Sequence, residues 1–324
     1  MPYQKELTIA LNAVKMACRL CRKVQQTLSD VQAIQKKDRS PVTIADLGSQ
    51  ALISLELLQA FPEDPIIGEE DAGVLRDNAD LCQKVLGLVL EQRDDVSEAR
   101  VLAAIDAGAG HSGCPQRFWT VDPIDGTKGF LRGEQYAIAL ALVEAGEVVL
   151  GVLGCPNFQV REGGNAGIFH AIRGQGAWFQ TLDGDAPNPI SVDSISDAAH
   201  ARFCESVERA HASHEDHERI SRRLGITAPP YRIDSQAKYA AVACGNASVY
   251  LRLPRSSDYR EKIWDHAAGA IVVTEAGGSV SDFSGNTLDF SRGRKLVSNV
   301  GILATNEHLH EDALNAISAI FETV

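Results

Sequence analysis

Hydrophobic residues at the start of the chain recur at the spacing of an amphipathic helix. The apolar face of this first helix carries Leu7, Ala10, Leu11, Val14, Ala17, Cys18, Cys21 and Val24. A second helix is predicted between Thr43, which would cap it, and Pro62, before which it ends. Its apolar face carries Leu47, Ala51, Leu55 and Leu58. The short apolar run from Pro65 to Gly68 ends on acidic residues and predicts a strand.

From Phe118 onward the helical spacing gives way to short apolar runs separated by turns. The run 118–121 predicts a strand, and paired runs around the turns 144–147 and 173–176 predict two hairpins. Further along, helices are predicted over 214–224, 263–276 and 309–320, with a strand at 249–253 and Gly277 closing the second of these helices. Residues 71–80 and 106–116 are predicted loops that flank a helix from Leu81 to Leu90. Strands and helices mix throughout, which indicates an α/β (α+β) protein with layered sheets.

The length of the chain limits the number of domains, and its net charge limits the kinds of partner. A chain of 324 residues suits two packed domains or one large one. Its formal net charge of −12 argues against partners with phosphate backbones and against anionic membrane surfaces, which attract basic proteins. The charge leaves open a small anionic substrate held by a local basic pocket or by a metal. We therefore expect neither a nucleic-acid nor a membrane partner.

The same composition favours a cytoplasmic location. No stretch approaches the roughly 20 apolar residues that a membrane helix needs. The N-terminal segment carries Lys5 and Glu6 and is not typical of a secretory signal. The 7 scattered cysteines are typical of reduced intracellular thiols.

The segment 119–129 carries the most informative chemistry. An apolar strand leads to Asp122, Pro123 interrupts strand pairing, and Gly126 permits a tight turn after Asp125. Two carboxylates at a strand end repel each other unless a cation lies between them. Oxygen ligands without neighbouring Cys or His favour Mg²⁺ over zinc, and the Ile124 carbonyl is a further candidate ligand. The alternative is an ordinary turn whose aspartates cap local N–H groups.

Three other acidic positions suit the same centre. Glu69 lies in Gly68-Glu69-Glu70-Asp71 after the strand predicted at 65–68, and Asp265 precedes an apolar helix. Asp46 lies in the first turn of the second helix. Each acid taken alone would be explained by the helix dipole or by solvent exposure. Their common place at the ends of apolar elements favours one shared site.

These strings resemble the lithium-sensitive, magnesium-dependent phosphomonoesterases of the inositol monophosphatase superfamily. The signatures are GEED at 68–71, DPIDGTKGF at 122–130, WDHAAG at 264–269 and EAGG at 275–278. Within the superfamily the chain is similar to the bisphosphate nucleotidase branch. That similarity lies in KKDRSPVTIAD (36–46), SVERAHASHE (206–215), DSQAKYA (234–240), YLRLP (250–254) and EKIWDHAAG (261–269).

The resemblance implies a layered αβαβα sandwich of the inositol monophosphatase and sugar phosphatase type. It implies an N-terminal domain, residues 1–155, with most metal ligands, and a C-terminal domain, residues 156–324, with the nucleotide-binding residues. Two or three Mg²⁺ ions would be bound by Glu69, Asp122, Ile124, Asp125 and Asp265. Asp46 and Thr127 would activate the attacking water. The substrate would contact Gly126, Thr127, His211, Ser235, Lys238, Arg252 and Asp265.

The implied reaction is hydrolysis of the 3′-phosphate of 3′-phosphoadenosine 5′-phosphate to give AMP. The sulfated form of this nucleotide and inositol 1,4-bisphosphate are further candidate substrates. Two alternatives stay open: a plain inositol monophosphatase, and a catalytically silent nucleotide-binding regulator. Without the resemblance, Lys238 would be interpreted as a solvated helix charge and Arg252 as an outward strand residue.

Other motifs have simpler interpretations. Ser235 and Lys238 match a Ser-x-x-Lys pattern, but the strings that accompany it in serine acyl-enzymes do not occur. His211, His214 and His217 are spaced by three in a polar segment, which does not favour zinc. Cys18 and Cys21 lie in the apolar stripe of the first helix, which indicates core packing, and a regulatory disulfide is the minor alternative.

Overall fold

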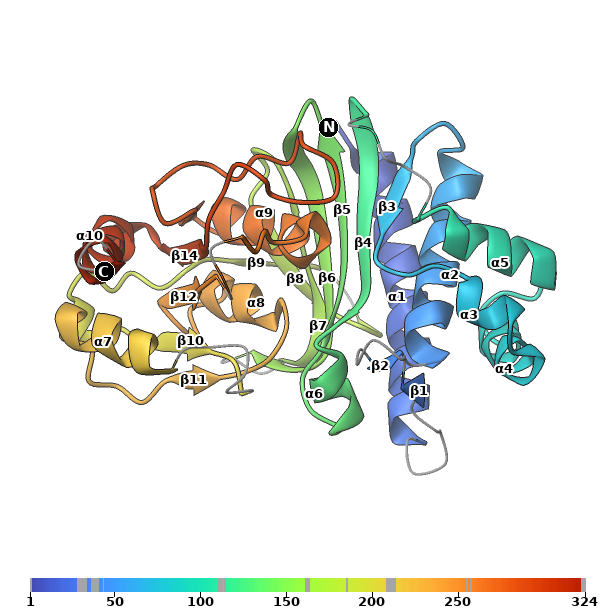
Figure 1. Cartoon of the computed structure of the whole chain (residues 1–324), viewed down its shortest axis with the longest axis horizontal. Helices are drawn as coiled ribbons and strands as arrows, with labels where there is room; N and C mark the ends of the chain where they lie inside the picture. The colour runs from blue at the N-terminus through green and yellow to red at the C-terminus, as the bar shows by residue number, and fades with distance from the viewer. Residues whose placement is uncertain are drawn as a thin grey trace.

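Two β-sheets organise the chain in the computed structural model, which describes residues 2–27, 34–35, 41–42, 44–109, 113, 115–160, 164–184, 186–207, 214–254, 256 and 258–321. The larger sheet has seven strands in the order β3-β4-β5-β6-β7-β8-β9, and the smaller has five in the order β11-β10-β12-β14-β13. Figure 1 shows the larger sheet near the middle of the molecule with helices on both of its faces. A small pair, β1 (Ile34–Gln35) and β2 (Pro41–Val42), lies apart from both.

The larger sheet confirms the predicted strands and both hairpins. Its strands are β3 (Ile66–Gly68), β4 (Arg117–Asp125), β5 (Ala137–Glu144), β6 (Glu147–Val160), β7 (Gly164–Ile172), β8 (Ala177–Thr181) and β9 (Asn188–Ile190). β3 and β4 run parallel, and every later pair is antiparallel. The parallel register pairs Gly68 with Val121, so Glu69, which follows β3, lies beside Asp122 of β4.

Alternating side chains on β5 explain why both faces of this sheet are covered. Ile138, Leu140 and Leu142 join a core beneath the N-terminal helices. The small residues between them face the second helical layer, which lets its helices approach closely. A Cβ added at Gly151 on β6 would lie 2.4 Å from Cγ2 of Ile271 and 2.9 Å from the Ala268 carbonyl oxygen.

Three helical layers enclose the two sheets. The outer N-terminal layer holds α1 (Gln4–Gln26), α2 (Ile44–Ala60), α4 (Ala79–Leu90) and α5 (Glu98–Asp106). The middle layer holds α8 (Ala237–Ala243) and α9 (Ala267–Glu275), whose residues are buried almost entirely. The outer C-terminal layer holds α7 (His214–Leu224) and α10 (His310–Phe321).

The smaller sheet lies between the last two of these layers. Its strands are β10 (Phe203–Glu205), β11 (Tyr231–Arg232), β12 (Val249–Arg252), β13 (Gly278–Ser281) and β14 (Ile302–Asn306). Strands β10, β11 and β12 are parallel, and β14 is antiparallel to both of its neighbours. The αβαβα arrangement implied by the family resemblance is therefore confirmed (Figure 1).

Several elements differ from the sequence predictions. The loop predicted over 71–80 contains the short helix α3 (Gly73–Arg76) and the start of α4, and α5 was not predicted. α5 begins where Ser97 caps it by accepting a hydrogen bond from the Arg100 N–H at 3.4 Å. The helix predicted over 263–276 is interrupted at His266, which separates the 3₁₀ turn η3 (Ile263–Asp265) from α9. Short 3₁₀ turns also occur at Ala198–His200 (η1) and Glu307–Leu309 (η4).

The change from the larger to the smaller sheet follows β9, which ends at Ile190. Position 155 lies inside β6, so the larger sheet continues beyond the end of the predicted N-terminal domain. The turn-rich segment 183–189 lies near the change of sheet, and the division into two domains stays a prediction. No helix within the described part of the chain is long and apolar enough to cross a membrane.

Candidate active site

Strand β4 carries Asp122 into the interior of the protein. The side chain is 2% exposed, and its Oδ1 atom is buried without a hydrogen-bond partner among the described residues. The ladder with β5 is regular as far as Asp122 and resumes at Asp125, so Pro123 interrupts the pairing as predicted. The Ser49 hydroxyl of α2 donates to the Pro123 carbonyl at 2.9 Å and supports this irregular stretch.

A tight turn follows these two aspartates. Gly126 has a φ of 89°, and α6 (Thr127–Leu131) begins directly after it. The Thr127 hydroxyl donates to the Ile124 carbonyl at 3.3 Å. A predicted catalytic residue and a predicted metal ligand therefore lie together. A Cβ added at Gly126 would lie 2.9 Å from the Cβ of Ser235, which brings the C-terminal half of the chain against this turn.

The predicted acidic residues interact strongly with one another. Burial raises the pKa of Asp122 well above its usual range, and the charges of Glu69, Asp125, Asp265 and Asp46 raise it further. Burial and then the charge of Asp265 also raise the pKa of the Glu69 carboxyl, although the residue as a whole is exposed. The pKa values of Glu69 and Asp122 respond to acids from separate parts of the sequence, so the fold brings Asp46, Glu69, Asp122, Asp125 and Asp265 together. We call these residues the acidic cluster.

Asp125 connects the acids to the cationic residues of the C-terminal half. Burial and the charge of Asp265 raise the pKa of Asp125 to about 6. Lys238, Arg252 and the N–H of Gln236 oppose that shift, the last by donating to Oδ2 at 2.5 Å. Asp125 is therefore the acid whose pKa is affected both by another acid and by two cations.

The predicted nucleotide-binding residues lie on the elements that face this cluster. Ser235 has a φ of 69° and accepts a hydrogen bond from the Ala237 N–H at 3.1 Å at the start of α8. Lys238 is 4% exposed, and burial lowers its pKa. Its Nζ lies 5.3 Å from the ring centroid of Tyr250. The interpretation of Lys238 as a solvated charge is therefore excluded.

Arg252, on β12, is likewise turned toward the site. Its Nη2 lies 3.2 Å from Asp265 Oδ2 and 2.8 Å from Glu261 Oε2. Burial alone would raise the pKa of Glu261, but the hydrogen bond from His266 and the charge of Arg252 outweigh it and lower the pKa to about 2. The guanidinium of Arg252 thus supplies the positive charge between Glu261 and Asp265.

The residues that support Arg252 were not predicted from the sequence. Glu261 Oε2 lies 3.2 Å from His266 Nε2, and His266 Nδ1 lies 2.7 Å from the Tyr239 hydroxyl. Glu261, Asp265 and His266 present metal-ligand atoms within 4.8 Å of one another, but Arg252 is already paired with the two acids. Glu261 and His266 both lie in the string 261–269, where a carboxylate and an imidazole on either side of Asp265 were the available signal.

Other sequence candidates lie elsewhere or outside the described residues. His211 and Thr43 are not among the described residues. His217 is buried on α7 beside Glu205, with 3.7 Å between Nδ1 and Oε1. Cys18 and Cys21 are buried, and burial raises the pKa of both thiols, as expected for core residues.

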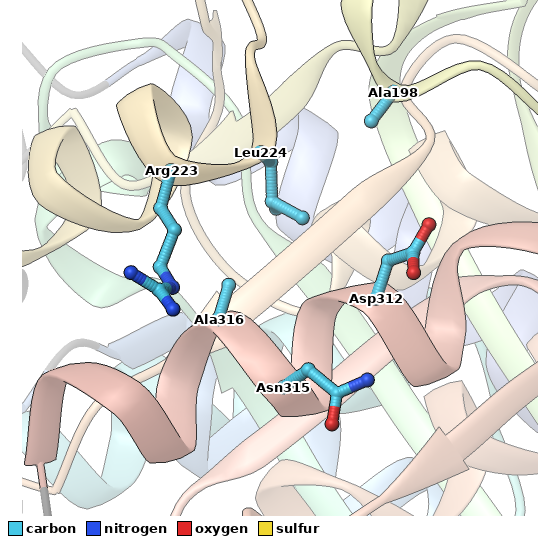
Figure 2. Close-up of a pocket in the computed structure, with 6 residues that line it drawn as sticks. All are labelled: Ala198, Arg223, Leu224, Asp312, Asn315 and Ala316. Carbon is cyan, nitrogen blue, oxygen red and sulfur yellow. The ribbon is translucent and has the colours of Figure 1, made fainter.

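A cavity of about 260 Å³ lies apart from these residues, between α7, α10 and η1. Figure 2 shows Arg223 and Leu224 of α7 on one side of it and Asp312, Asn315 and Ala316 of α10 on the other. None of its lining residues belongs to the predicted site. The acidic cluster, and not this cavity, therefore carries the candidate chemistry.

The acidic cluster fits a hard divalent cation. Its donors are oxygens, and Asp122 Oδ1 has no protein partner among the described residues despite its burial. Burial of an unpaired carboxylate oxygen is unfavourable unless a cation or proton compensates it. Mg²⁺ prefers such carboxylate and carbonyl ligands.

Relatives of known name cover nearly the whole chain. A protein named 3′(2′),5′-bisphosphate nucleotidase from Oryza sativa is 47% identical over 338 residues, covering 98% of this chain and 94% of the relative. One of the same name from Schizosaccharomyces pombe is 42% identical, covering 99% of this chain and 97% of the relative. A probable 3′(2′),5′-bisphosphate nucleotidase 4 from Arabidopsis thaliana is 43% identical, covering 99% and 96%.

Solved structures share the fold. The inositol monophosphatase of Thermotoga maritima superposes with a TM-score of 0.70 at 23% identity and covers 99% of each chain. The inositol monophosphatase from Anabaena (Nostoc) superposes with a TM-score of 0.64 at 20% identity, covering 98% of this chain and 97% of that one. The model of the inositol monophosphatase family matches residues 3–321. The chain therefore belongs to the inositol monophosphatase family.

Proposed function

We propose that the protein is a magnesium-dependent phosphatase that hydrolyses the 3′-phosphate of 3′-phosphoadenosine 5′-phosphate and releases AMP. The observation that carries the proposal is the meeting of the acidic cluster with cations: Arg252 Nη2 lies 3.2 Å from Asp265 Oδ2, and the charges of Lys238 and Arg252 oppose the rise in the pKa of Asp125. The names of the relatives at 42–47% identity support the same substrate. The family is generally Mg²⁺-dependent.

The acids supply the metal side of the proposed site. Glu69, Asp122, Asp125, Asp265 and the Ile124 carbonyl would hold the Mg²⁺, with two or three ions as the expected number. Bound Mg²⁺ would acidify water and neutralise charge on the phosphoryl and leaving oxygens. Asp46 is 3% exposed in the first turn of α2 and would pair with Thr127 to activate the attacking water.

The opposite side of the proposed site holds the nucleotide. Gly126 and Thr127 would hold the 3′-phosphate that is cleaved. Ser235, Lys238 and Arg252 would bind the retained 5′-phosphate, because a buried ammonium and a guanidinium gain most from a doubly charged anion. His211 completes the proposed nucleotide contacts from outside the described residues. Asp265 would orient Arg252 as well as contribute to the metal side.

The finer points stay proposals. The sulfated nucleotide and inositol 1,4-bisphosphate are further candidate substrates because each carries two anionic groups. A cytoplasmic location and the absence of nucleic-acid and membrane partners stay predictions from composition.

The decisive experiment measures phosphate release from 3′-phosphoadenosine 5′-phosphate with Mg²⁺ and with EDTA. We expect release with Mg²⁺ only. Folded protein that binds the nucleotide without releasing phosphate would instead identify a silent regulator. Turnover of inositol monophosphate without turnover of the nucleotide would identify a plain inositol monophosphatase.

A variant tests the phosphate-binding side separately. Lys238→Met should raise KM for the bisphosphate by about 10-fold or more, since a buried charge contact to phosphate is lost. Turnover of 3′-AMP, which lacks the 5′-phosphate, should change little. Arg222→Met, on the exposed face of α7, serves as the matched control. Equal losses on both substrates would place Lys238 outside the 5′-phosphate contacts.

A further inference from the structure

The peptide that precedes Glu69 is held by an arginine from the opposite half of the chain. Arg294 donates through Nη2 to the Gly68 carbonyl at 2.6 Å and through Nη1 to the Gly108 carbonyl at 3.0 Å. Gly68 itself donates to the Gly108 carbonyl at 2.8 Å, so the guanidinium joins two backbone segments that already touch. A side chain 226 residues away from Gly68 thus fixes the end of β3.

The same arginine also supports the residue before Asp265. Its guanidinium carbon lies 4.6 Å from the ring centroid of Trp264. Its main-chain carbonyl accepts a hydrogen bond from Ile263 N–H at 3.3 Å, and the neighbouring Leu296 N–H donates to the Glu261 carbonyl at 2.9 Å. Arg294 therefore contacts the segments that carry Glu69 and Asp265.

A buried glutamine holds Glu69 from the other side. Gln50 on α2 is 0% exposed, and its amide nitrogen donates to the carbonyls of Glu70 at 2.6 Å and Ile105 at 2.9 Å. Its Oε1 accepts a hydrogen bond from the Glu70 N–H at 3.0 Å. Both residues adjacent to Glu69 thus have backbone groups held by side chains from other elements. We call Gln50 and Arg294 together the Glu69 clamp.

We propose that the Glu69 clamp is a positioning device for the metal side of the site, in which Arg294 sets the separation between Glu69 and Asp265. This inference rests on the proposed metal-binding role of those two acids. Neither clamp residue needs to touch the ion. Residues that orient metal ligands contribute to affinity because each ligand then loses less freedom on binding.

The charge of Arg294 and its contacts have opposite expected effects on metal affinity, so the sign of the change on substitution tests the inference. A cation beside a cation site weakens metal binding by repulsion, so its removal alone would tighten binding. Loss of the clamp would loosen Glu69 and weaken binding. Arg294→Gln removes both the charge and the paired contacts to Gly68 and Gly108, so the sign of the change in metal affinity shows which effect is larger.

The experiment titrates metal-free protein with Mn²⁺ and follows free Mn²⁺ by electron paramagnetic resonance. We expect Arg294→Gln to weaken Mn²⁺ binding by about 10-fold. Arg294→Lys keeps the charge and can still donate to one of the two carbonyls, so only part of the clamp is lost and binding should weaken less. Arg292→Gln is the matched control, since Arg292 is exposed in the same loop and pairs with Asp289. Gln50→Met tests the other side of the clamp and should also weaken binding.

Two further measurements distinguish positioning from general stability. In phosphate-release assays, Arg294→Gln should raise the Mg²⁺ concentration for half-maximal rate while KM for the nucleotide at saturating Mg²⁺ stays the same. Thermal melts without metal report stability alone. Unchanged or tighter Mn²⁺ binding in Arg294→Gln, with or without a lower metal-free Tm, would overturn the inference.

The Mn²⁺ titration needs no nucleotide, so it separates this inference from the proposed function. Wild-type protein that binds Mn²⁺ but hydrolyses no bisphosphate would contradict the proposed reaction while the clamp is still judged by Mn²⁺ affinity. Wild-type protein that binds no Mn²⁺ would refute the clamp and the proposed metal site together.

Discussion

The carboxylate of Asp125 accepts a hydrogen bond from the main-chain N–H of Gln236 at 2.5 Å, across 111 residues of sequence. This contact joins the end of β4 to the start of α8. It places the strained backbone of Ser235, with its φ of 69°, directly against the acidic cluster. The Gln236 side chain is anchored in turn, because its amide contacts Trp264 O at 2.7 Å and Gly269 N at 3.1 Å. The acids and the proposed phosphate contacts therefore hold one another in place.

Asp122→Asn should abolish nearly all turnover while the fold survives. The variant keeps the shape of a residue that is 2% exposed but removes the charge that a metal needs, so the rate should fall by about 100-fold or more. The metal-free Tm should not decrease, because the substitution relieves repulsion among buried carboxylates. Phosphate release and circular dichroism check both points, with exposed Asp80→Asn as control. A near-normal rate would exclude Asp122 as an essential ligand.

When metal is removed, the Tm of the protein should depend on the protonation state of the acidic residues. Asp125 has its pKa raised to about 6 in the folded chain, above its value of about 4 when unfolded. Its contribution to stability is therefore present below about pH 4 and is lost as the pH rises through 6. With EDTA, Tm should fall over that range more in wild type than in Asp125→Asn. Added Mg²⁺ should restore the wild-type Tm at pH 7, and a Tm that ignores EDTA would count against metal binding.

His170 should produce a pH dependence of the opposite sign. It is 4% exposed on β7, its Nε2 has no partner among the described residues, and burial and then the charge of Lys15 lower its pKa to about 4. The unfolded chain, with a histidine pKa of about 6.5, binds the proton more readily, so stability is lost as the pH falls from 6.5 to 4. The loss reaches about 3 kcal/mol at most.

His170→Gln should remove most of this slope in denaturant melts at a series of pH values, leaving the smaller part due to His310, whose pKa burial also lowers. His308→Gln, at an exposed position of η4, should keep the wild-type profile. An unchanged slope in His170→Gln would show that this histidine does not resist protonation.

Two glycine substitutions should change stability in opposite directions. A Cβ at Gly269 on α9 would lie 2.2 Å from Cδ2 of Tyr239, so Gly269→Ala should cost about 1–3 kcal/mol by forcing α8 and α9 apart. Gly87 lies exposed within α4 with nothing within 4 Å of an added Cβ. Gly87→Ala should stabilise by up to about 1 kcal/mol, because alanine favours the helix. Urea unfolding of both variants checks the signs.

Lithium should inhibit phosphate release, as the family resemblance implies. The proposed site offers carboxylate and carbonyl oxygens, which bind small hard cations. The assay compares added LiCl with equal KCl, so that ionic strength is the same. Full activity at high lithium would count against a site typical of the family.

Local sequence determined most elements of the fold. The helical spacing of apolar residues from Leu7 to Val24 predicted α1, and the apolar runs on either side of 144–147 predicted the β5–β6 hairpin. Both predictions succeed because the spacing of apolar residues sets which face of a helix or strand is apolar. The break at His266 could not be predicted from spacing. At this break the imidazole contacts Tyr239 and Glu261, which lie outside the helix that the spacing predicted.

The sequence by itself determined the identity of the acids at 69, 122, 125 and 265 and their positions at the ends of apolar elements. It also supplied the strings that indicate the family. Only the tertiary structure decided that Lys238 and Arg252 face those acids and that Arg294 and Gln50 hold the residues next to Glu69. The physical reason is that a spacing pattern records one element at a time, whereas burial, charge interactions and backbone contacts between distant segments arise only when the layers pack together.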